Sequence, residues 1–388
     1  MDNQTSSEPA LLATIEDGHA NNFDFLRFVL ATLVVASHCY SLTSRNRTEF
    51  SHREPLLIAT RGQMTGGDLA VNGFFIVSGF LITASRQNSR RAIDFLRKRV
   101  LRIYPGFLTA VLFGLLIVAP LGAPDLHAYL HNQSVLRDLL YMAQLFPPQT
   151  DNVFSNWSSH DQVNGSLWTI RYEFWCYLLI MGLGMVQLIQ RRALMLALTT
   201  VVYGIYVYQL TFHLALLHGR SIEPFGIPNF YPRFLTYFFV GMVFFIYRDT
   251  IPRDHSVLAL CVVLLLALAA MGSGFDACMP ACGAYILFYI AFSRRLCMNS
   301  FARSGDLSYG IYLYAFPVQQ LALYFIQKPS GSTIGPLMLF IVAYPITLLL
   351  AVMSWHLIEK PFLRMKPRNR TSPYIELQLD NSSAKPLN

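Results

Sequence analysis

The chain has 388 residues, of which 54% are hydrophobic and only 13% are charged. Soluble domains carry about 25% charged residues, so this composition excludes an ordinary soluble protein and indicates a polytopic membrane protein. The formal net charge of +8 would favour nucleic acid as the partner of a soluble protein; here the basic residues are instead expected to mark cytoplasmic loops, and no nucleic-acid partner is expected.

The segment before residue 23 is predicted to be a cytoplasmic tail. Residues 1–22 contain four acidic residues and no Lys or Arg, so they lack the positive start of a cleaved signal peptide. We therefore expect a single membrane domain over residues 23–363. The polar residues 364–388 are expected to form a second cytoplasmic tail, which is predicted to be disordered.

The first predicted span, Phe23 to Leu42, contains three ionisable side chains: Asp24, Arg27 and His38. At about 1.5 Å per residue it can cross a hydrocarbon core of roughly 30 Å. Because Arg27 and His38 are eleven positions apart, they share one helix face about 16 Å apart along the axis. An ionisable group in a span costs at least about 2.5 kcal/mol, so it usually has a function or a partner. Two structural alternatives stay open: Arg27 can snorkel to the headgroups, and His38 can bond a backbone carbonyl.

The second predicted span, Leu69 to Ala84, follows a polar segment with four arginines and is rich in small residues. Its Gly73, Ser78 and Gly79 would let another helix approach closely. The densest basic run of the chain comes next, from Arg86 to Arg102.

Pro105 suits the opening turn of a third span that ends near Leu121. A weakly charged outer region, Gly122 to Ser166, then holds an apolar piece, Leu139 to Phe146, that is too short to cross a membrane. Trp157 and His160 lie in its polar later half, which is predicted either to bind sugars or to be an ordinary loop.

Seven further apolar stretches bring the predicted number of spans to about ten, in an all-α integral membrane fold: Leu167–Ile189, Ala193–Leu210, Phe234–Tyr247, Ser256–Met271, Ala277–Phe292, Ser308–Ile326 and Pro336–His356. Threading these spans from a cytoplasmic start places 19 of the 30 Lys and Arg on the cytoplasmic side and eight on the other side. The positive-inside rule therefore predicts that both termini are cytoplasmic.

Two close cysteines, Cys278 and Cys282, allow one short-range disulfide near the outer surface. Further ligands for a zinc site are lacking in this stretch, so no metal is expected.

The basic run contains Arg97-Lys98-Arg99 followed by Arg102. Adjacent guanidiniums bind phosphates with paired, charge-assisted hydrogen bonds. A topology signal or a contact with anionic lipids is the alternative.

A second candidate site is Asn164 to Trp168, which runs into Arg171 and Glu173. A carboxylate inside the outer end of a span favours a functional or paired role. The stretch Trp355 to Pro361, with Glu359 and Lys360, has the features of an ordinary helix stop, and this structural interpretation is favoured there.

At these residues the chain resembles the acyltransferase family 3 of integral membrane O-acyltransferases. The resemblance covers nearly all of residues 23–363, through motifs in the family's order: FDFLRFVLATLVVASH, GFFIVSGFLITA, FLRKRVLRIYP, NGSLWTIRYEF, LSYGIYLYAFPV and WHLIEKPF. The family's Arg, ten residues, then His pattern falls on Arg27 and His38, and its Arg-x-Arg signature falls on Arg97 and Arg99. The chain is expected to lack the extra esterase-like domain that some members carry.

The resemblance implies transfer of an acyl group, usually acetyl, from cytoplasmic acetyl-CoA or another acyl-CoA to a hydroxyl of a surface polysaccharide, another exported glycan or a small molecule. It implies a multi-pass protein of the bacterial cytoplasmic membrane, with acyl-CoA as a donor substrate and no permanently bound cofactor. The expected partners are acyl-CoA, a hydroxyl-bearing acceptor and the lipid bilayer.

The residues themselves fit this chemistry, because a thioester donor carries phosphates at one end of a long arm and the reactive carbonyl at the other. Arg97, Arg99, Arg102 and Arg27 are expected to bind the phosphates. His38 is expected to be the general base, since an ordinary imidazole pKa of about 6.5 suits proton transfer near neutral pH.

Ser78, Trp168 and Glu173 are further candidate binding residues. Direct transfer is the preferred route, and an acyl-His38 intermediate stays an alternative. The competing class is a proton-coupled exporter or a flippase of a lipid-linked sugar, which would also use ionisable residues inside spans.

Overall fold

The computed structural model is helical throughout the part of the chain that it describes. An isolated bridge between Ile222 and Gly226 is the one β-type pairing within this part. The described residues are 21–44, 46–132, 134–148, 153–154, 162–213, 220–293, 305–330 and 334–366. Trp157 and His160, most of the two tails, and the basic residues 294, 295 and 303 lie outside these ranges.

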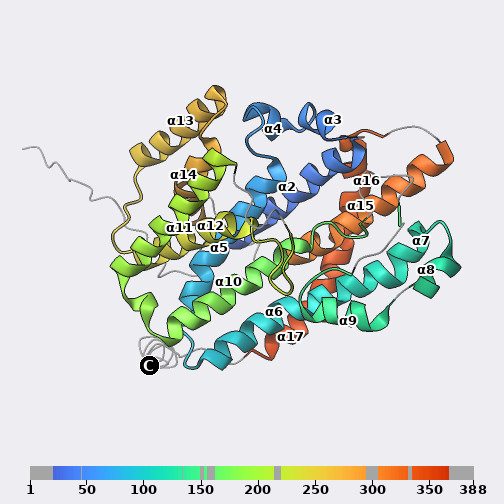
Figure 1. The fold of residues 1–388 in the computed structure, drawn as a ribbon, viewed down its shortest axis with the longest axis horizontal. Coiled ribbons are helices and arrows are strands. Elements are labelled where there is room, and N and C mark those ends of the chain that lie inside the picture. The colour runs from blue at the N-terminus through green and yellow to red at the C-terminus, as the bar shows by residue number, and fades with distance from the viewer. Residues whose placement is uncertain are drawn as a thin grey trace, which may run out of the picture.

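Among the residues that the structure describes, ten long helices form the body of the molecule (Figure 1). They are α2 (Phe23–Thr43), α5 (Gly66–Gln87), α6 (Ala92–Phe113), α10 (Trp168–Met185), α11 (Arg192–Phe212), α12 (Phe230–Ile246), α13 (His255–Met271), α14 (Phe275–Ala291), α15 (Ser308–Ser330) and α16 (Pro336–Ser354). Short helices connect or extend them: α3 (Arg47–Ser51), α4 (Pro55–Ala59), α7 (Ala119–Gly122), α8 (Leu126–Asn132), α9 (Val135–Ala143) and α17 (Lys360–Arg364).

Within the described ranges, five helical segments are long and apolar enough to cross a membrane: Phe23–Thr43, Gly66–Gln87, Ala92–Gly122, Arg192–Phe212 and Pro336–Arg364. Three shorter helices, α12, α13 and α14, are also apolar. The expected all-α fold is confirmed. The count of about ten spans and the cytoplasmic position of both termini stay predictions.

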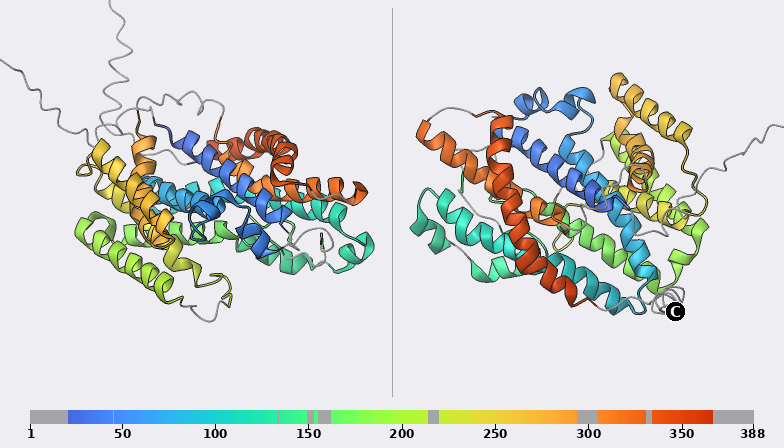
Figure 2. Two further views of the ribbon diagram at one scale, coloured as in Figure 1. Left: turned by 90° about the horizontal axis from the view of Figure 1, so that it is seen from above. Right: turned by 180° about the vertical axis from the view of Figure 1, so that it is seen from behind.

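Helix α5 occupies the middle of the molecule. It packs against α12 on one side and α2 on the other, and also contacts α10 and α14. Helix α15 joins α2 to α16. Both views in Figure 2 place the α13–α14 pair at one end of the molecule and α7 and α8 at the other. The residues of α2, α5, α10 and α15 therefore meet in the interior.

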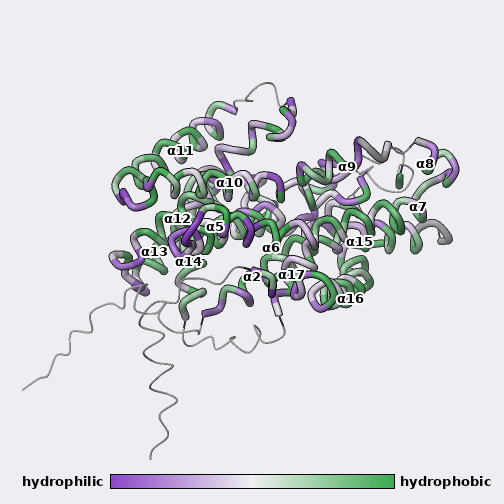
Figure 3. The backbone as a smooth tube through the Cα atoms, turned by 90° about the horizontal axis from the view of Figure 1, so that it is seen from below, coloured by the Kyte–Doolittle hydropathy of each residue, from purple (hydrophilic) through white to green (hydrophobic). Residues whose placement is uncertain are grey.

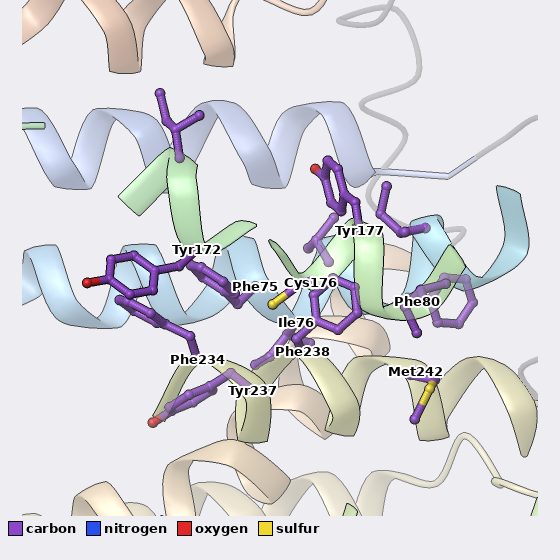
Figure 4. Packing of buried hydrophobic residues seen from close by; sticks show 14 of the residues in the cluster. Phe75, Ile76, Phe80, Tyr172, Cys176, Tyr177, Phe234, Tyr237, Phe238 and Met242 are labelled. Carbon is purple, nitrogen blue, oxygen red and sulfur yellow. The ribbon is translucent and has the colours of Figure 1, made fainter. Parts of the chain in front are cut away.

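Aromatic side chains fill the contact between α5, α10 and α12 (Figure 4). Phe75 of α5 stacks on Phe234 of α12 with ring centroids 4.4 Å apart, and Tyr237 and Phe238 are fully buried beside them. Such rings bury about 150–250 Å² each, so this cluster holds α5 rigidly against its neighbours.

Apolar residues also occur on the outside of the molecule: Figure 3 colours much of the backbone of α11 and α16 as hydrophobic, and many of their large apolar side chains are exposed. Leu349 of α16 is 60% exposed and Leu266 of α13 is 65% exposed. Soluble proteins rarely expose apolar surface so extensively. These faces are suited to contact with lipid chains.

Two predicted helix boundaries are wrong. The third span does not open at Pro105, because α6 begins at Ala92 and carries the basic residues on its first turns. The helix also does not stop before Pro361: a π-helical turn (Trp355–Glu359) connects α16 directly to α17, and Pro361 lies at the start of α17. Cys278 and Cys282 are both free, so the allowed disulfide is not formed.

Candidate active site

An ionic cluster closes the end of the helical body where α2 and α15 begin. Asp306, just before α15, accepts hydrogen bonds from Arg27 of α2, Arg102 of α6 and the hydroxyl of Ser308. The Asp306 side chain is only 13% exposed. One carboxylate thus ties together three helices that are far apart in the sequence.

A second carboxylate of this cluster comes from the π-helical turn. Glu359 is 2% exposed and lies 3.4 Å from Nη1 of Arg102, and its other oxygen accepts a hydrogen bond of 3.1 Å from Ser354. π-Helical turns occur frequently at functional sites. The sequence interpretation of this stretch as a plain helix stop missed Glu359, as it missed Asp306.

Helical geometry separates the basic residues of α6. Arg99 and Arg102 are one turn apart and both point toward the interior, whereas Arg97 is exposed and Lys98 is buried, where it donates to Ser89. Arg99 donates to the hydroxyl of Ser85 over 3.2 Å and lies over the ring of Tyr177. The predicted pair Arg97 and Arg99 therefore does not share one surface.

Lys366, after α17, lies within electrostatic reach of the same cluster. Burial, followed by the charges of Arg102 and Arg99, lowers the pKa of the Lys366 ammonium to about 7. Burial alone would raise the pKa of the Asp306 carboxyl, but Arg102 and Arg27 outweigh it and hold that pKa well below its usual range. Within the described residues, neither Arg99 nor Lys366 makes an ion pair, so these two cations are not neutralised by direct contact.

A cavity of about 50 Å³ extends from this cluster into the helical body. Arg27, Ser308 and Tyr309 line its inner end, and Thr169 and Tyr312 line its outer end. A volume this small holds one or two water molecules.

Glu173 projects into the middle of this cavity from α10. Its carboxylate accepts hydrogen bonds from Ser78 of α5 and Tyr177 of α10, which satisfies it inside the helical body. The structure therefore brings together Ser78, Glu173 and Arg27, three of the predicted site residues, around one space.

The outer end of the cavity leads to His38 through a chain of hydroxyl groups. Tyr312 donates to the backbone oxygen of Ser166 over 2.6 Å, so the hydroxyl of Thr169 must donate to Tyr312. The Ser166 hydroxyl lies 3.5 Å from Nδ1 of His38. The edge of the Phe316 ring packs against the imidazole.

The predicted segment Asn164 to Trp168 builds this outer end. Asn164 is buried and donates to the backbone oxygen of Leu313 over 2.8 Å, which fixes the segment to α15. Trp168 packs its ring against Phe230 of α12, with centroids 4.7 Å apart. Trp168 thus forms part of the wall beside the cavity rather than its lining.

The arrangement has cations at one end of α2, an imidazole near its other end and a polar cavity between them. Among the described residues, no three His, Cys, Asp or Glu side chains are grouped closely enough to hold a metal ion. Proton transfer by His38 and binding of anionic groups by Arg99 and Lys366 are the chemical capacities of these side chains.

Comparisons with known proteins identify the family of the chain. A family model described as an acyltransferase domain matches residues 21–356. A protein named O-acetyl transferase from Shigella phage Sf6 is 31% identical over 373 residues, which cover 92% of this chain and 99% of that protein. Nodulation protein 10 from Rhizobium leguminosarum bv. viciae is 26% identical over 373 residues, which cover 90% and 95% of the two chains. No solved structure matches.

Proposed function

This chain belongs to the acyltransferase-domain family, and we propose that it moves an acetyl or other short acyl group from cytoplasmic acyl-CoA to a hydroxyl of a cell-surface or exported glycan. Family membership makes the protein a membrane O-acyltransferase, which decides against the exporter or flippase alternative. What we propose is the identity of the donor, the identity of the acceptor, and the side of the membrane on which each of them binds.

One observation carries this proposal: the cationic cluster and His38 lie toward opposite ends of the same helix. Arg27 lines the cavity between them, and hydrogen bonds connect its Thr169 and Tyr312 through Ser166 to His38. An acyl-CoA has the matching shape, with phosphates at one end of a long arm and the thioester at the other. Arg27 and His38 are about 16 Å apart along α2. The phosphates would remain at the mouth of the cavity, beside the ionic cluster of Arg27, Arg102 and Asp306, while the thioester approaches His38.

At the mouth, Arg99 and Lys366 are the best candidates for phosphate contacts. Asp306 and Glu359 already neutralise Arg27 and Arg102. Arg99 also has Nε buried without a hydrogen-bond partner in the described part of the chain. A guanidinium with unused donors binds phosphate oxygens bidentately. Arg97 is proposed to contribute from the exposed face of α6.

At the outer end, His38 acts as general base. Its imidazole takes the proton of the acceptor hydroxyl while the oxygen attacks the thioester carbonyl carbon. The tetrahedral intermediate then collapses, the C–S bond breaks, and His38 returns the proton to the leaving thiolate, giving CoA and the ester. Positioned acid–base catalysis of this kind contributes about 10² to 10⁴ in rate.

The donor cannot enter the structure unchanged, because a cavity of about 50 Å³ is smaller than an acyl thioester arm. Binding therefore requires α2, α5, α10 and α15 to move apart around the cavity. The hydrogen bond from Ser78 of α5 to Glu173 of α10 crosses this space and would have to break or rearrange.

The proposed topology follows the basic residues: about ten spans in a bacterial cytoplasmic membrane, with both termini in the cytoplasm. In this orientation Arg99, Arg102 and Lys366 face the compartment that holds acyl-CoA. His38 and the Asn164 to Trp168 segment then lie toward the outside, where an exported glycan arrives.

The test is the chemistry of the host's surface glycans with and without this gene. Base-labile acetate, measured on purified polysaccharide by NMR, should disappear on deletion. It should return with the wild-type gene and not with a His38→Ala variant expressed at the same level in the membrane. Identical ester content in every surface glycan of the two strains would overturn the glycan acceptor.

A further inference from the structure

A second and much larger cavity lies at the other end of α5 from the basic residues. Its volume is about 1070 Å³, and it lies between the ends of α5, α11, α12 and α14. Asp68 on the first turn of α5 lines it, whereas Arg86 on the last turn lies about 27 Å farther along the helix. In the proposed topology this cavity opens to the outside.

The polar lining of this cavity is rich in unused hydrogen-bond acceptors. Oδ1 of Asp276 and Oδ1 of Asn229 are buried and accept no hydrogen bond within the described part of the chain. A buried acceptor without a donor costs about 1–3 kcal/mol. Both atoms therefore favour a ligand that brings O–H or N–H groups.

The charges in this cavity favour a ligand that is not an anion. The guanidinium of Arg233 is already paired with Asp68 over 2.8 Å and bonded to Asn72 over 2.9 Å. Asp276 makes no ion pair among the described residues, so one carboxylate is left over. Excess negative charge repels an anionic ligand and accepts hydrogen bonds from hydroxyls.

Aromatic rings supply the apolar part of the wall. Tyr206 of α11 and Phe230 of α12 line the cavity, together with the amide side chains of Gln63 and Gln209. Ligand sites combine apolar and aromatic walls with a few placed polar groups in volumes of about 300–1,000 Å³. A segment of a few sugar units has this mixture of hydroxyl groups and apolar C–H faces.

Two close contacts lie between this cavity and the site at His38. Gly67, beside Asp68, approaches Ser37 so closely that an added Cβ would lie 3.2 Å from the Ser37 hydroxyl. Phe230 packs on Trp168, two residues after Ser166. Residues at or beside the cavity lining therefore contact residues that neighbour His38 and Ser166 in the chain.

We propose that this cavity binds a neutral carbohydrate segment of the acceptor next to the sugar that is acylated at His38. The inference rests on the proposed function. It adds the location of an acceptor subsite and its preference for uncharged, hydroxyl-rich chains.

The experiment uses the full chain in lipid nanodiscs and oligosaccharides cut from the host's surface polysaccharide in a strain that lacks the gene. Asp276→Asn should weaken oligosaccharide binding at least tenfold and leave the acetyl-CoA dissociation constant within twofold. Asp249→Asn is the matched control, because this carboxylate is 46% exposed and paired with Arg192 away from the cavity. An unchanged oligosaccharide dissociation constant in Asp276→Asn would overturn the subsite.

A blocking experiment avoids dependence on the folding of one variant. Ser273 is exposed at the cavity, so Ser273→Cys labelled with a bulky maleimide should raise the polysaccharide KM and leave acetyl-CoA binding unchanged. The wild-type chain treated with the same reagent is the control. If transfer proceeds with an unchanged polysaccharide KM, or if native mass spectrometry finds a phospholipid there that the oligosaccharide does not displace, the inference is wrong and the proposed function stands.

Binding in the cavity without any acyl transfer would have the opposite meaning: the subsite would stand and the proposed function would fail. Absence of both binding and transfer would reject both.

Discussion

The hydroxyl of Ser166 lies 3.5 Å from Nδ1 of His38, although the two residues are 128 positions apart. Ser166 is itself held by Tyr312, which also bonds Thr169 at the outer end of the cavity. The imidazole is therefore placed relative to the cavity by α15 and by the segment before α10. This placement suits the proposed role of His38 as general base.

His38→Ala is expected to abolish acyl transfer while the protein stays inserted and folded. The reason is the loss of the imidazole that contacts Ser166, which we propose as the general base. Turnover of purified protein measures the effect, and thermal unfolding in detergent checks the fold. His255→Ala is the control, since His255 bonds Tyr289 outside this site and should keep its activity. Retention of more than about a tenth of wild-type turnover, under about 1.4 kcal/mol of barrier, would reject the assignment.

Arg99→Lys is expected to raise the KM for acetyl-CoA by about tenfold, because an ammonium cannot hold phosphate oxygens bidentately. Arg97→Lys is expected to have a smaller effect, since Arg97 is exposed on a different face of α6. Both variants keep the positive charge that fixes the topology. Initial rates at varied acetyl-CoA give the result, and wild-type behaviour of both variants would leave topology as the only role of these residues.

Asp306→Asn is expected to destabilise the protein by about 3 kcal/mol, because it leaves the guanidiniums of Arg27 and Arg102 without their shared carboxylate in a largely buried place. The exposed pair of Arg192 and Asp249 offers the comparison: Asp249→Asn should cost under about 1 kcal/mol. Denaturant or thermal unfolding of both variants measures these two losses of stability. Equal stability of the two variants would mean that Asp306 has no such role.

The sequence predicted most of the long helices. Of the candidate site, it indicated Arg27 and His38 but not Asp306 and Glu359. Arg27 and His38 could be placed on one face because both lie on one helix, where spacing determines direction. Asp306 and Glu359 could not be found in the same way, because their partner Arg102 is more than 200 residues away from each of them. A carboxylate just outside a span, or just before a proline, has no local feature that distinguishes it.

The basic run shows a different kind of error. Interpreted as a loop that precedes Pro105, the run has no helical phase, and the pairing of Arg97 with Arg99 rests on the family's Arg-x-Arg signature. A helix that begins at Ala92 separates their directions and joins Arg99 to Arg102 instead. The sequence does contain a sign of this helical phase, since the apolar residue Phe95 lies one turn before Arg99. The structure buries Phe95 fully.

Gly79→Ala is expected to destabilise the contact between α5 and α12 by about 1–3 kcal/mol. A Cβ at Gly79 would lie 1.9 Å from the backbone oxygen of Phe238, and a Cβ at Gly241 would lie 2.0 Å from that of Ile76. Backbone atoms cannot swing aside as a flexible side chain can, so the helices must separate. Gly204→Ala is the control, because a Cβ there meets nothing within 4 Å. A thermal midpoint in Gly79→Ala that equals that of the control would contradict this close packing.

The KM for acetyl-CoA is expected to rise as the pH increases from 6 to 8, through loss of the proton on Lys366. Its pKa is lowered to about 7, so in the free enzyme the ammonium is mostly charged at pH 6 and mostly neutral at pH 8. A charged ammonium attracts the donor phosphates and a neutral amine does not. The 3′-phosphate of the donor gains charge over the same range, with a second pKa near 6, and this change opposes the effect.

The comparison with Lys366→Arg separates the two contributions. A guanidinium stays charged throughout this pH range, so the variant should show only the change that comes from the donor. Between pH 6 and pH 8, the wild-type KM should therefore rise about three- to tenfold relative to that of Lys366→Arg. The Lys366→Gln variant should have a higher KM than Lys366→Arg at both pH values. If the wild-type and Lys366→Arg curves run parallel, Lys366 does not contact the donor, and the phosphates must be held by Arg99 and its neighbours on α6 alone.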